Sequence, residues 1–344
     1  MKKVIALLLC LVMALGLLAA CGNGNAQKDA GSKKIETLRV AFVPSREPSE
    51  IITATEPLKQ MLKDELTNLG WEIGNVDITV GTTYEAVGEG LVAGTIDVGL
   101  IPGGTYVLYD DGAEVILTAT RDGLSKDSDE AKDWNDGTPT EASDKQAVSY
   151  RALMIAGPSD KGQALVNKVN SGEELTWEDL SGAAWTVMSA SSASGYIYPA
   201  LWLNEKFGKT IADLPSVVQS DSYSTSMARL ASEQADIAVG FAHLQYKYAD
   251  QWTTDFGRTA SVWEETNVLG VTGGIYNDTV SVSKASAIMT DGFRQAFGEA
   301  MIEIGETEEG LAIIQTFAHT GYTFGQDADY DGERDAQALL QSLS

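Results

Sequence analysis

The chain has 344 residues, 44% of them hydrophobic, and a formal net charge of -25 at pH 7. The length favours two lobes over one, and the apolar content is that of an ordinary globular protein. The negative charge argues against a nucleic-acid partner and against a basic membrane-binding surface. It still allows a small anionic ligand, because a local group of N–H donors outweighs a distant, screened charge.

The N-terminus has the pattern of a bacterial lipoprotein signal. Two lysines, Lys2-Lys3, are followed by an apolar stretch that ends at Ala20, directly before Cys21. We expect residues 1–20 to be a removed signal peptide. Cys21 would then be the only cysteine of the mature chain and would carry a lipid that holds the protein on the membrane's extracytoplasmic face. A plain secretory peptide with an unrelated cysteine is the alternative. The small, polar residues 21–35 are predicted to be a flexible tether.

Strand and helix patterns alternate through the next part of the chain. Hydrophobic periodicity predicts strands at 36–44, 76–80, 94–101 and 114–120, and helices at 56–69 and 83–93. This order is typical of an α/β lobe with a largely parallel sheet. Residues 122–144 are charged and contain few apolar residues, so we interpret them as a solvated surface insertion.

The second half of the chain repeats this alternation. A strand at 147–156 is expected to cross into a second lobe, which continues with strands at 184–188, 217–220 and 235–241 and helices at 200–207 and 224–233. Residues 94–99 and 234–240 look alike and are interpreted as equivalent strands of two similar lobes. A strand at 279–283 leads the chain back, and helices at 287–305 and 307–317 complete the first lobe. The predicted lobes are residues 36–145 with 286–344, and residues 146–285.

A serine-rich stretch joins a predicted buried strand to a helix, with the sequence Ser189-Ala190-Ser191-Ser192-Ala193-Ser194-Gly195-Tyr196. The first turn of a helix has unpaired N–H groups and a partial positive charge. Serine hydroxyls add donors, and glycine allows the backbone to approach a ligand closely. The stretch therefore favours a cradle for a small anion, although an ordinary serine N-cap remains open.

Three tyrosines stand at the predicted junctions from strand to helix. Tyr84, Tyr106 and Tyr196 each have small hydroxyl residues beside them, such as Thr105 before Tyr106. One tyrosine there would be ordinary packing. Three of them indicate a polar pocket at the C-terminal ends of the strands, where open α/β sheets bind ligands.

Signatures of enzymes and metal sites are weak. His243 and His319 are the only histidines, and neither has a cysteine or glutamate at zinc spacing. Residues 191–195 lack the first glycine of the G-x-S-x-G motif. The run 327–332 resembles the start of a calcium loop, but Ala338 occupies the position of the required bidentate glutamate. A polar loop that caps the following helix is favoured there, and we expect no cofactor and no enzymatic activity.

Several motifs together resemble those of the substrate-binding lipoproteins of phosphate, phosphite and phosphonate ABC transporters. The segments that carry the resemblance are Leu38-Arg39-Val40-Ala41-Phe42-Val43-Pro44-Ser45, Thr83-Tyr84-Glu85-Ala86-Val87, Asp97-Val98-Gly99-Leu100-Ile101-Pro102-Gly103-Gly104-Thr105-Tyr106-Val107-Leu108, Ser192-Ala193-Ser194-Gly195-Tyr196-Ile197-Tyr198-Pro199, Ala235-Asp236-Ile237-Ala238-Val239-Gly240 and Asp329-Tyr330-Asp331-Gly332-Glu333-Arg334. The resemblance spans most of the mature chain in order, and the serine-glycine-tyrosine motif is its most specific part. It implies the type II periplasmic-binding-protein fold.

The resemblance also implies a set of ligand-binding residues. These are Ser192, Ala193, Ser194, Gly195 and Tyr223 in the second lobe, and Tyr84, Thr105 and Tyr106 in the first. The chain departs from the family at Ala193, where threonine is usual, and at Tyr223, where histidine is common. Loss of the threonine hydroxyl would cost on the order of 1 kcal/mol or select a different ligand. Arg46 is a further candidate, for which a solvated surface arginine is the alternative.

We therefore expect a monomeric, lipid-anchored receptor that closes by a hinge motion around a small oxyanion. Phosphonate, phosphite and phosphate are the favoured ligands, and an ABC permease and its ATPase are the expected partners. Three alternatives stay open. The same fold could bind a sulfonate, a thiamine precursor or another small organic solute, the protein could be a sensor or adhesin lipoprotein, or it could be a hydrolase using Ser192 or Ser194.

Overall fold

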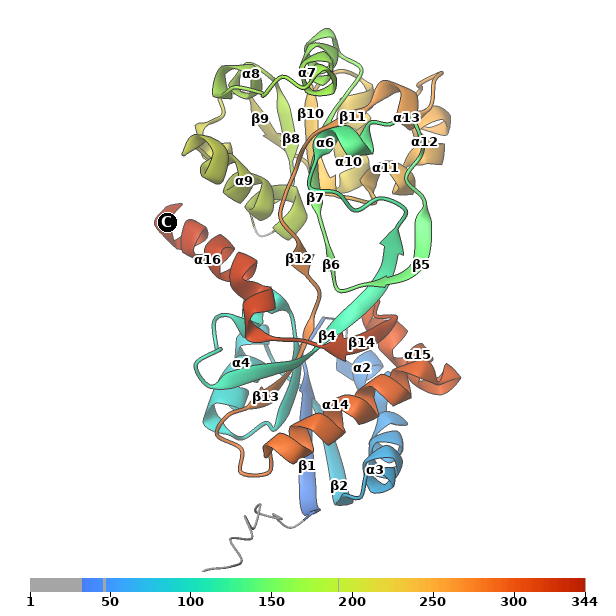
Figure 1. The fold of residues 1–344 in the computed structure, drawn as a ribbon, viewed down its shortest axis with the longest axis vertical. Coiled ribbons are helices and arrows are strands. Elements are labelled where there is room, and N and C mark those ends of the chain that lie inside the picture. The colour runs from blue at the N-terminus through green and yellow to red at the C-terminus, as the bar shows by residue number, and fades with distance from the viewer. Residues whose placement is uncertain (1–32, 46–47, 191, 344) are drawn as a thin grey trace, which may run out of the picture.

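The computed structural model describes residues 33–45, 48–190 and 192–343 (Figure 1). Cys21 and Arg46 lie outside the described residues, as do the expected signal peptide and most of the expected tether. The chain forms two lobes stacked along its long axis, each a sheet flanked by helices, which confirms the predicted two-lobed α/β architecture. In the part of the chain that the structure describes, no helix is long and apolar enough to cross a membrane.

The first lobe is built on a sheet in the order β14-β4-β13-β3-β1-β2. Its strands are β1 (Lys34–Phe42), β2 (Glu72–Val80), β3 (Val98–Ile101), β4 (Ala113–Leu124), β13 (Thr279–Ser283) and β14 (Gly321–Phe324), with β5 (Ala142–Ala147) paired to the outer end of β4. In this sheet β1 pairs parallel with β2 and with β3. β13 pairs antiparallel with β3 and with β4, and β14 pairs antiparallel with β4. The sheet is therefore mixed, because the chain returns from the second lobe in the opposite direction.

Both faces of the first sheet are covered. The helices are α2 (Pro48–Thr55), α3 (Leu58–Asn68), α4 (Tyr84–Ala93), α5 (Gly103–Tyr106), α14 (Asp291–Glu306) and α15 (Glu308–Ile314), with the short η3 (Gln315–Phe317). Side chains alternate along a strand. Val40 of β1 therefore packs into the cluster that holds Leu62 of α3, whereas Ala41 packs on the other face with Leu91 of α4. Burial on both faces explains why this strand reads as a continuous apolar run.

The second lobe has a five-stranded sheet in the order β11-β7-β10-β8-β9. Its strands are β7 (Ala152–Ala156), β8 (Trp185–Val187), β9 (Val217–Gln219), β10 (Ile237–Phe241) and β11 (Asn267–Val271). Its helices are α7 (Asp160–Ser171), α8 (Trp177–Ser181), α9 (Tyr198–Phe207), α10 (Tyr223–Ala231), α11 (Leu244–Lys247), α12 (Ala249–Thr254) and α13 (Val262–Glu265), with the short η1 (Ala193–Ile197) and η2 (Ile211–Asp213).

The two lobes share one local motif at the start of a central strand. Asp97 donates its backbone N–H to the carbonyl of Arg39 at 2.9 Å and accepts the Arg39 N–H on its carboxylate at 2.9 Å. Asp236 makes the same two contacts with Ala184, at 2.8 Å and 2.7 Å. Each aspartate thus fixes the start of its strand, β3 or β10, against the parallel neighbour. The interpretation of residues 94–99 and 234–240 as equivalent segments is confirmed.

The chain crosses between the lobes through a two-stranded ribbon. β6 (Ser149–Tyr150) pairs antiparallel with β12 (Ile275–Tyr276), between the two sheets (Figure 1). The next strand, β13, already pairs with β3 and β4 of the first lobe. The sequence-based boundary at residue 285 therefore comes too late, because apolar patterning identifies a strand but does not tell which sheet accepts it.

Residues 122–144 are not a simple solvated insertion. β4 continues to Leu124 and pairs with β5, and the intervening α6 (Ala131–Trp134) buries Trp134 in the core of the second lobe. Asn135 follows, and its side chain accepts from the backbone N–H of Val268 at 2.7 Å and donates to the Val268 carbonyl at 2.9 Å. This amide therefore pairs with the edge strand β11 as another strand would. We call residues 122–141 the arm, since they extend from the first lobe onto the second.

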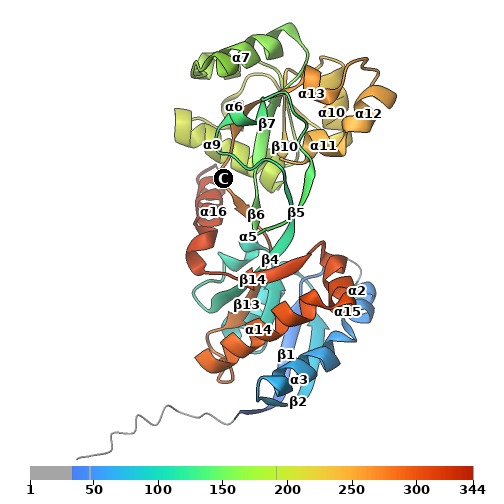
Figure 2. The ribbon, with the colours of Figure 1, turned by 45° about the vertical axis from the view of Figure 1, so that its right-hand side comes forward.

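The last helix also contacts both lobes. α16 (Asp331–Leu343) follows the short η4 (Asp327–Tyr330) and runs beside the junction, as Figure 1 and Figure 2 show. Arg334 forms an ion pair with Asp110 of the first lobe at 2.7 Å. Glu333 accepts a hydrogen bond from the hydroxyl of Tyr198, the first residue of α9, at 2.7 Å. The helix thus ties the first lobe to the start of α9.

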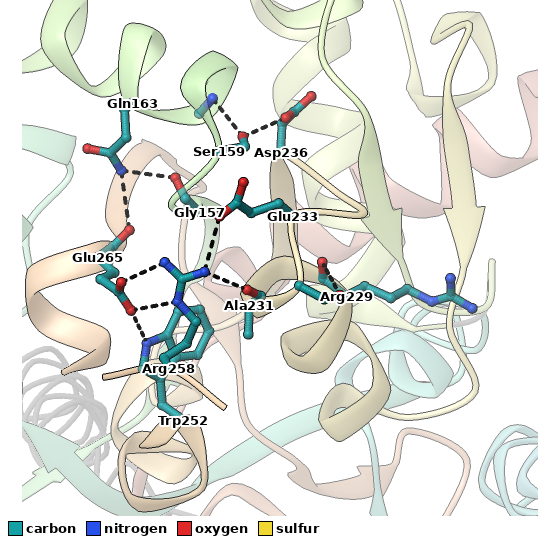
Figure 3. Close-up of polar contacts among 12 residues, drawn as sticks. Gly157, Ser159, Gln163, Arg229, Ala231, Glu233, Asp236, Trp252, Arg258 and Glu265 are labelled. Atoms are coloured by element: carbon teal, nitrogen blue, oxygen red, sulfur yellow. Dashed lines mark hydrogen bonds and ion pairs between the residues drawn. The ribbon is translucent and has the colours of Figure 1, made fainter. Parts of the chain in front are cut away.

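A polar cluster in the second lobe is centred on Arg258 (Figure 3). Arg258 donates to both carboxylate oxygens of Glu265, at 3.0 and 2.6 Å, and Trp252 donates its indole N–H to the same carboxylate at 2.8 Å. Arg258 also donates to the carbonyl of Ala231, the last residue of α10. Beyond it, Glu233 adopts the left-handed conformation with φ 63° and accepts from Arg258 at 3.1 Å. The guanidinium of Arg258 therefore binds both the C-terminal end of α10 and Glu233, the left-handed residue that follows it.

The variant Glu265→Gln is expected to lower the free energy of unfolding by about 1.5–3 kcal/mol, the usual contribution of charged hydrogen bonds. The hydrogen bond from Arg258 is the largest of the effects that lower the pKa of Glu265 below its ordinary value of 4.5, and it outweighs burial. This contribution is therefore complete above pH 4.5 and is lost as the pH falls below it. Urea unfolding between pH 7 and pH 3 should show a smaller acid-dependent loss in the variant, and equal losses in both proteins would contradict the assignment.

Candidate functional site

Two neighbouring cavities share one lining side chain. The larger, of about 540 Å³, is lined by the end of β4, the arm, β5, β6, Ser194, Tyr223 and the residues from Phe241 to His243. The smaller, of about 300 Å³, lies on the first lobe and is lined by Tyr84, residues of β3 and the segment from Thr316 to His319. Arg121 lines both cavities, so one side chain borders each of them. We call the two cavities together the candidate site.

The serine stretch reaches the larger cavity through Ser194. β8 ends at Val187, and a π-helical turn, η1, leads directly into α9. Ser192 caps this turn by accepting the N–H of Gly195 on its hydroxyl at 3.2 Å. The backbone amides of Ala193 and Ser194 open the helix, and among the described residues they have no acceptor. We call Ser192 to Gly195 the cradle, because its amides have the polarity that an anion requires.

Tyrosine hydroxyls lie directly beside the cradle. The hydroxyl of Tyr223, at the start of α10, is 3.0 Å from Oγ of Ser194 and 3.3 Å from Oγ of Ser192. Tyr150 of the ribbon lines the same cavity, and burial, partly offset by the charge of Arg121, raises its pKa to about 12. Both the second lobe and the ribbon therefore supply hydroxyl groups to this cavity.

The first lobe contributes positive charge through Arg121. Its Nε is buried and has no hydrogen-bond partner among the described residues, and its Nη2 is 3.9 Å from a carboxylate oxygen of Asp278. Asp278 is also 2.9 Å from Nε2 of His319. Burial raises the pKa of Asp278, but the hydrogen bond and charge of His319, aided by Arg121, outweigh it and lower the pKa below its ordinary value. Arg121 is thus held near one carboxylate while part of its donor capacity remains free.

Sequence reasoning placed two first-lobe residues in the site that line neither cavity. Tyr106 is 1% exposed, packs against Tyr330, and donates its hydroxyl to Asp327 at 2.6 Å. The reason is that α5 starts directly after Pro102, which turns the side chain of Tyr106 into the core. Thr105 of the same helix also lines neither cavity. Tyr84, Ser194 and Tyr223 line the cavities, whereas Ser192, Ala193 and Gly195, which were also expected at the ligand, line neither.

The carboxylates of the calcium-like run 327–332 take part in contacts within the protein. Asp327 accepts the hydrogen bond from Tyr106 and also forms an ion pair with Arg334. Arg334 pairs in addition with Asp331 at 2.8 Å. The carboxylate of Asp329 accepts the backbone N–H of Gln326 at 2.9 Å. Groups of three or more potential metal ligands are absent from the residues the structure describes.

Three residues of the site were missed by sequence reasoning. Arg121 directly follows the predicted strand 114–120. A charged residue at the end of a strand is the sequence feature that could have indicated it. Tyr150 lies inside an expected strand that is in fact broken into β5, β6 and β7. His243 follows β10, and it was considered only as a metal ligand or base, whereas the structure places it beside Phe241.

A two-lobed α/β protein with a cavity between its lobes, lined by both polar and apolar residues, has the fold and the kind of site of a solute-binding protein. A family model described as "ABC transporter, phosphonate, periplasmic substrate-binding protein" matches residues 40–330, and the chain belongs to this family. It is an extracytoplasmic substrate-binding protein of an ABC importer, with a permease and an ATPase as its partners.

Individual relatives are distant. The chain is 22% identical over 327 residues to the phosphate-import protein PhnD of Mycolicibacterium smegmatis, covering 92% of this chain and 90% of that one. The solved structure of Mh-p37 of Mycoplasma hyorhinis, called a putative thiamine pyrophosphate transporter, is similar with a TM-score of 0.62 at 13% identity, covering 89% and 100%. XAC2383 from Xanthomonas citri, bound to ATP, is similar with a TM-score of 0.54 at 13% identity, covering 90% and 98%. These two likenesses show the fold.

Proposed function

We propose that the protein captures a phosphorus oxyanion between the cradle and Arg121. The observation that carries this proposal is the convergence of unlike donors on one cavity. Ser194, with its amide and its hydroxyl, the hydroxyl of Tyr223 and the guanidinium of Arg121 line this cavity and come from both lobes. A tetrahedral oxyanion has acceptors in several directions and satisfies such donors together, and it compensates the charge of Arg121. Tyr84 would contact the ligand from the smaller cavity.

The ligand would also hold the lobes closed. The cradle belongs to the second lobe and Arg121 to the end of a first-lobe strand, with the ribbon of β6 and β12 between them. An oxyanion that binds donors on both sides favours the closed state by its additional contacts there. The ligand is released unchanged to the permease. We further propose that the protein is a monomer attached to the membrane by a lipid on Cys21, which the signal pattern at the N-terminus supports.

A thermal-shift screen of the mature protein tests the ligand class. Phosphate, phosphite, methylphosphonate and 2-aminoethylphosphonate are compared with sulfate and taurine. A ligand present at a hundred times its dissociation constant adds about 2.7 kcal/mol to the free energy of unfolding. At least one phosphorus oxyanion should raise the melting temperature. If the sulfur compounds stabilise the protein and the phosphorus compounds do not, the proposed ligand class is wrong.

The variant Arg121→Gln tests the site. Loss of one charge-assisted contact of about 1.5–3 kcal/mol weakens binding by about 10- to 100-fold. Lys206→Gln makes the same change in net charge on the exposed side of α9 and serves as the control. Equal affinities of both variants and the wild type would remove Arg121 from the site.

A further inference from the structure

A continuous row of rings leads away from the cradle along the second lobe. The Tyr223 ring, whose hydroxyl contacts Ser194, lies 4.9 Å from that of Phe241, and the Phe241 ring lies 6.5 Å from that of His243. All three residues line the larger cavity. We call Tyr223, Phe241 and His243 the aromatic row.

The arm adds apolar side chains to the lining of the same cavity. Leu124 and Trp134 line the cavity there, and Trp134 is held in place because its indole N–H donates to the carbonyl of Ser128 at 3.0 Å. Leu124 and Trp134 pack in the same apolar cluster as Tyr223 and Phe241, so apolar surface continues from the aromatic row onto the arm. The arm is docked on the second lobe through Asn135, so it moves with this lobe rather than away from it.

The geometry points to a ligand larger than an inorganic oxyanion. We infer that the physiological ligand is an organic phosphonate or phosphate monoester whose flat, apolar or aromatic substituent lies on the aromatic row. This inference rests on the proposed function, because it takes the cradle as the site of the phosphorus group. It deepens that proposal by naming the substituent.

Closure of the lobes does not remove this surface. The cradle, the aromatic row and the docked arm all belong to the second lobe or are fixed to it, so their relative positions are kept when the hinge moves. A bare phosphate would leave the row facing water, whereas a planar substituent would bury it and contact it in an offset-stacked or edge-to-face arrangement.

The charges along this wall favour an uncharged substituent over a second anionic group. Lys126 is 2.6 Å from Asp136, and Arg151 is paired with Asp127 and Asp129. The cavity is also lined by the carboxylates Asp122 and Asp127. Burial lowers the pKa of His243 below its ordinary value of 6.5, opposed by a hydrogen bond with the backbone of Asp122 and aided by the charge of Arg121. The imidazole is thus neutral at pH 7 and offers a ring rather than a positive charge.

The experiment compares three probes by isothermal titration calorimetry at pH 7.5: methylphosphonate, phenylphosphonate and phosphonoacetate. The wild type should bind phenylphosphonate at least tenfold more tightly than methylphosphonate. Phe241→Ala and His243→Ala should each reduce this ratio to about threefold or less. Tyr246→Ala removes an aromatic residue of α11 that is 47% exposed and lines neither cavity, and it should keep the full ratio.

The outcomes separate the two proposals. If the wild type binds none of the three probes nor phosphate, the proposed function fails. If it binds methylphosphonate as tightly as phenylphosphonate, or phosphonoacetate most tightly, the phosphorus ligand stands and the inferred substituent is wrong. A preference for phenylphosphonate that persists in both variants also overturns the role of the aromatic row. His243→Ala provides this test even if Phe241→Ala proves unstable, because His243 lies at the far end of the row.

Discussion

Replacing Asp97 by alanine is expected to lower the free energy of unfolding of the first lobe by about 3 kcal/mol or more, because a buried carboxylate that accepts several hydrogen bonds is lost. The Asp97 side chain is fully buried. It accepts hydrogen bonds from the backbone and the guanidinium of Arg39, and from the hydroxyl of Ser286 at 2.6 Å. Alanine would leave these donors without their acceptor. It would also free β1, β3 and the end of β13 from their common attachment.

Asp97→Asn is the matched control, because it keeps one oxygen as an acceptor at the same position. Its loss of stability should be clearly smaller than that of Asp97→Ala. Asp236→Ala removes the corresponding carboxylate from the second lobe, where it accepts from Ala184 and from Ser159 at 2.6 Å. Each alanine variant should destabilise its own lobe in urea unfolding followed by hydrogen exchange. A loss below 1 kcal/mol for Asp97→Ala would show that these contacts are dispensable.

These aspartates also show how far sequence patterns define the fold. The resemblance between residues 94–99 and 234–240 is short, yet it reflects two identical backbone arrangements. Patterns of this kind are local, and they predict strands and helices well because alternation and helical spacing depend on neighbours in the chain. They do not tell which strands become partners. β13 was therefore recognised as a strand but assigned to the wrong lobe.

The site was predictable where it depends on local structure. The cradle is a turn between a strand and a helix, and its serines and glycine identified it. Arg121, Tyr150 and His243 reach the same cavity from segments distant in sequence, and their convergence depends on the ribbon and the arm. Tyr106 illustrates the reverse error. The motif was right for a helix start, but the direction of the side chain is decided by packing against Tyr330.

Gly195→Ala tests the cradle with the smallest possible change. A Cβ at this position would lie 2.4 Å from Cγ and 2.5 Å from Cβ of Met188, and 2.8 Å from Oγ of Ser192. Met188 cannot move away easily, because its backbone N–H donates to the carbonyl of Gly195 at 3.0 Å. The turn itself must therefore shift, and the cap at Ser192 and the amides of the cradle shift with it.

We expect Gly195→Ala to weaken phosphorus-oxyanion binding by about 10- to 100-fold, which corresponds to the loss of one or two charge-assisted hydrogen bonds. Gly292→Ala is the control, because a Cβ there would meet only Trp71, at 3.8 Å, in the exposed first turn of α14. Calorimetry measures affinity, and circular dichroism checks that both variants are folded. A folded Gly195→Ala protein with wild-type affinity would place the oxyanion outside the cradle.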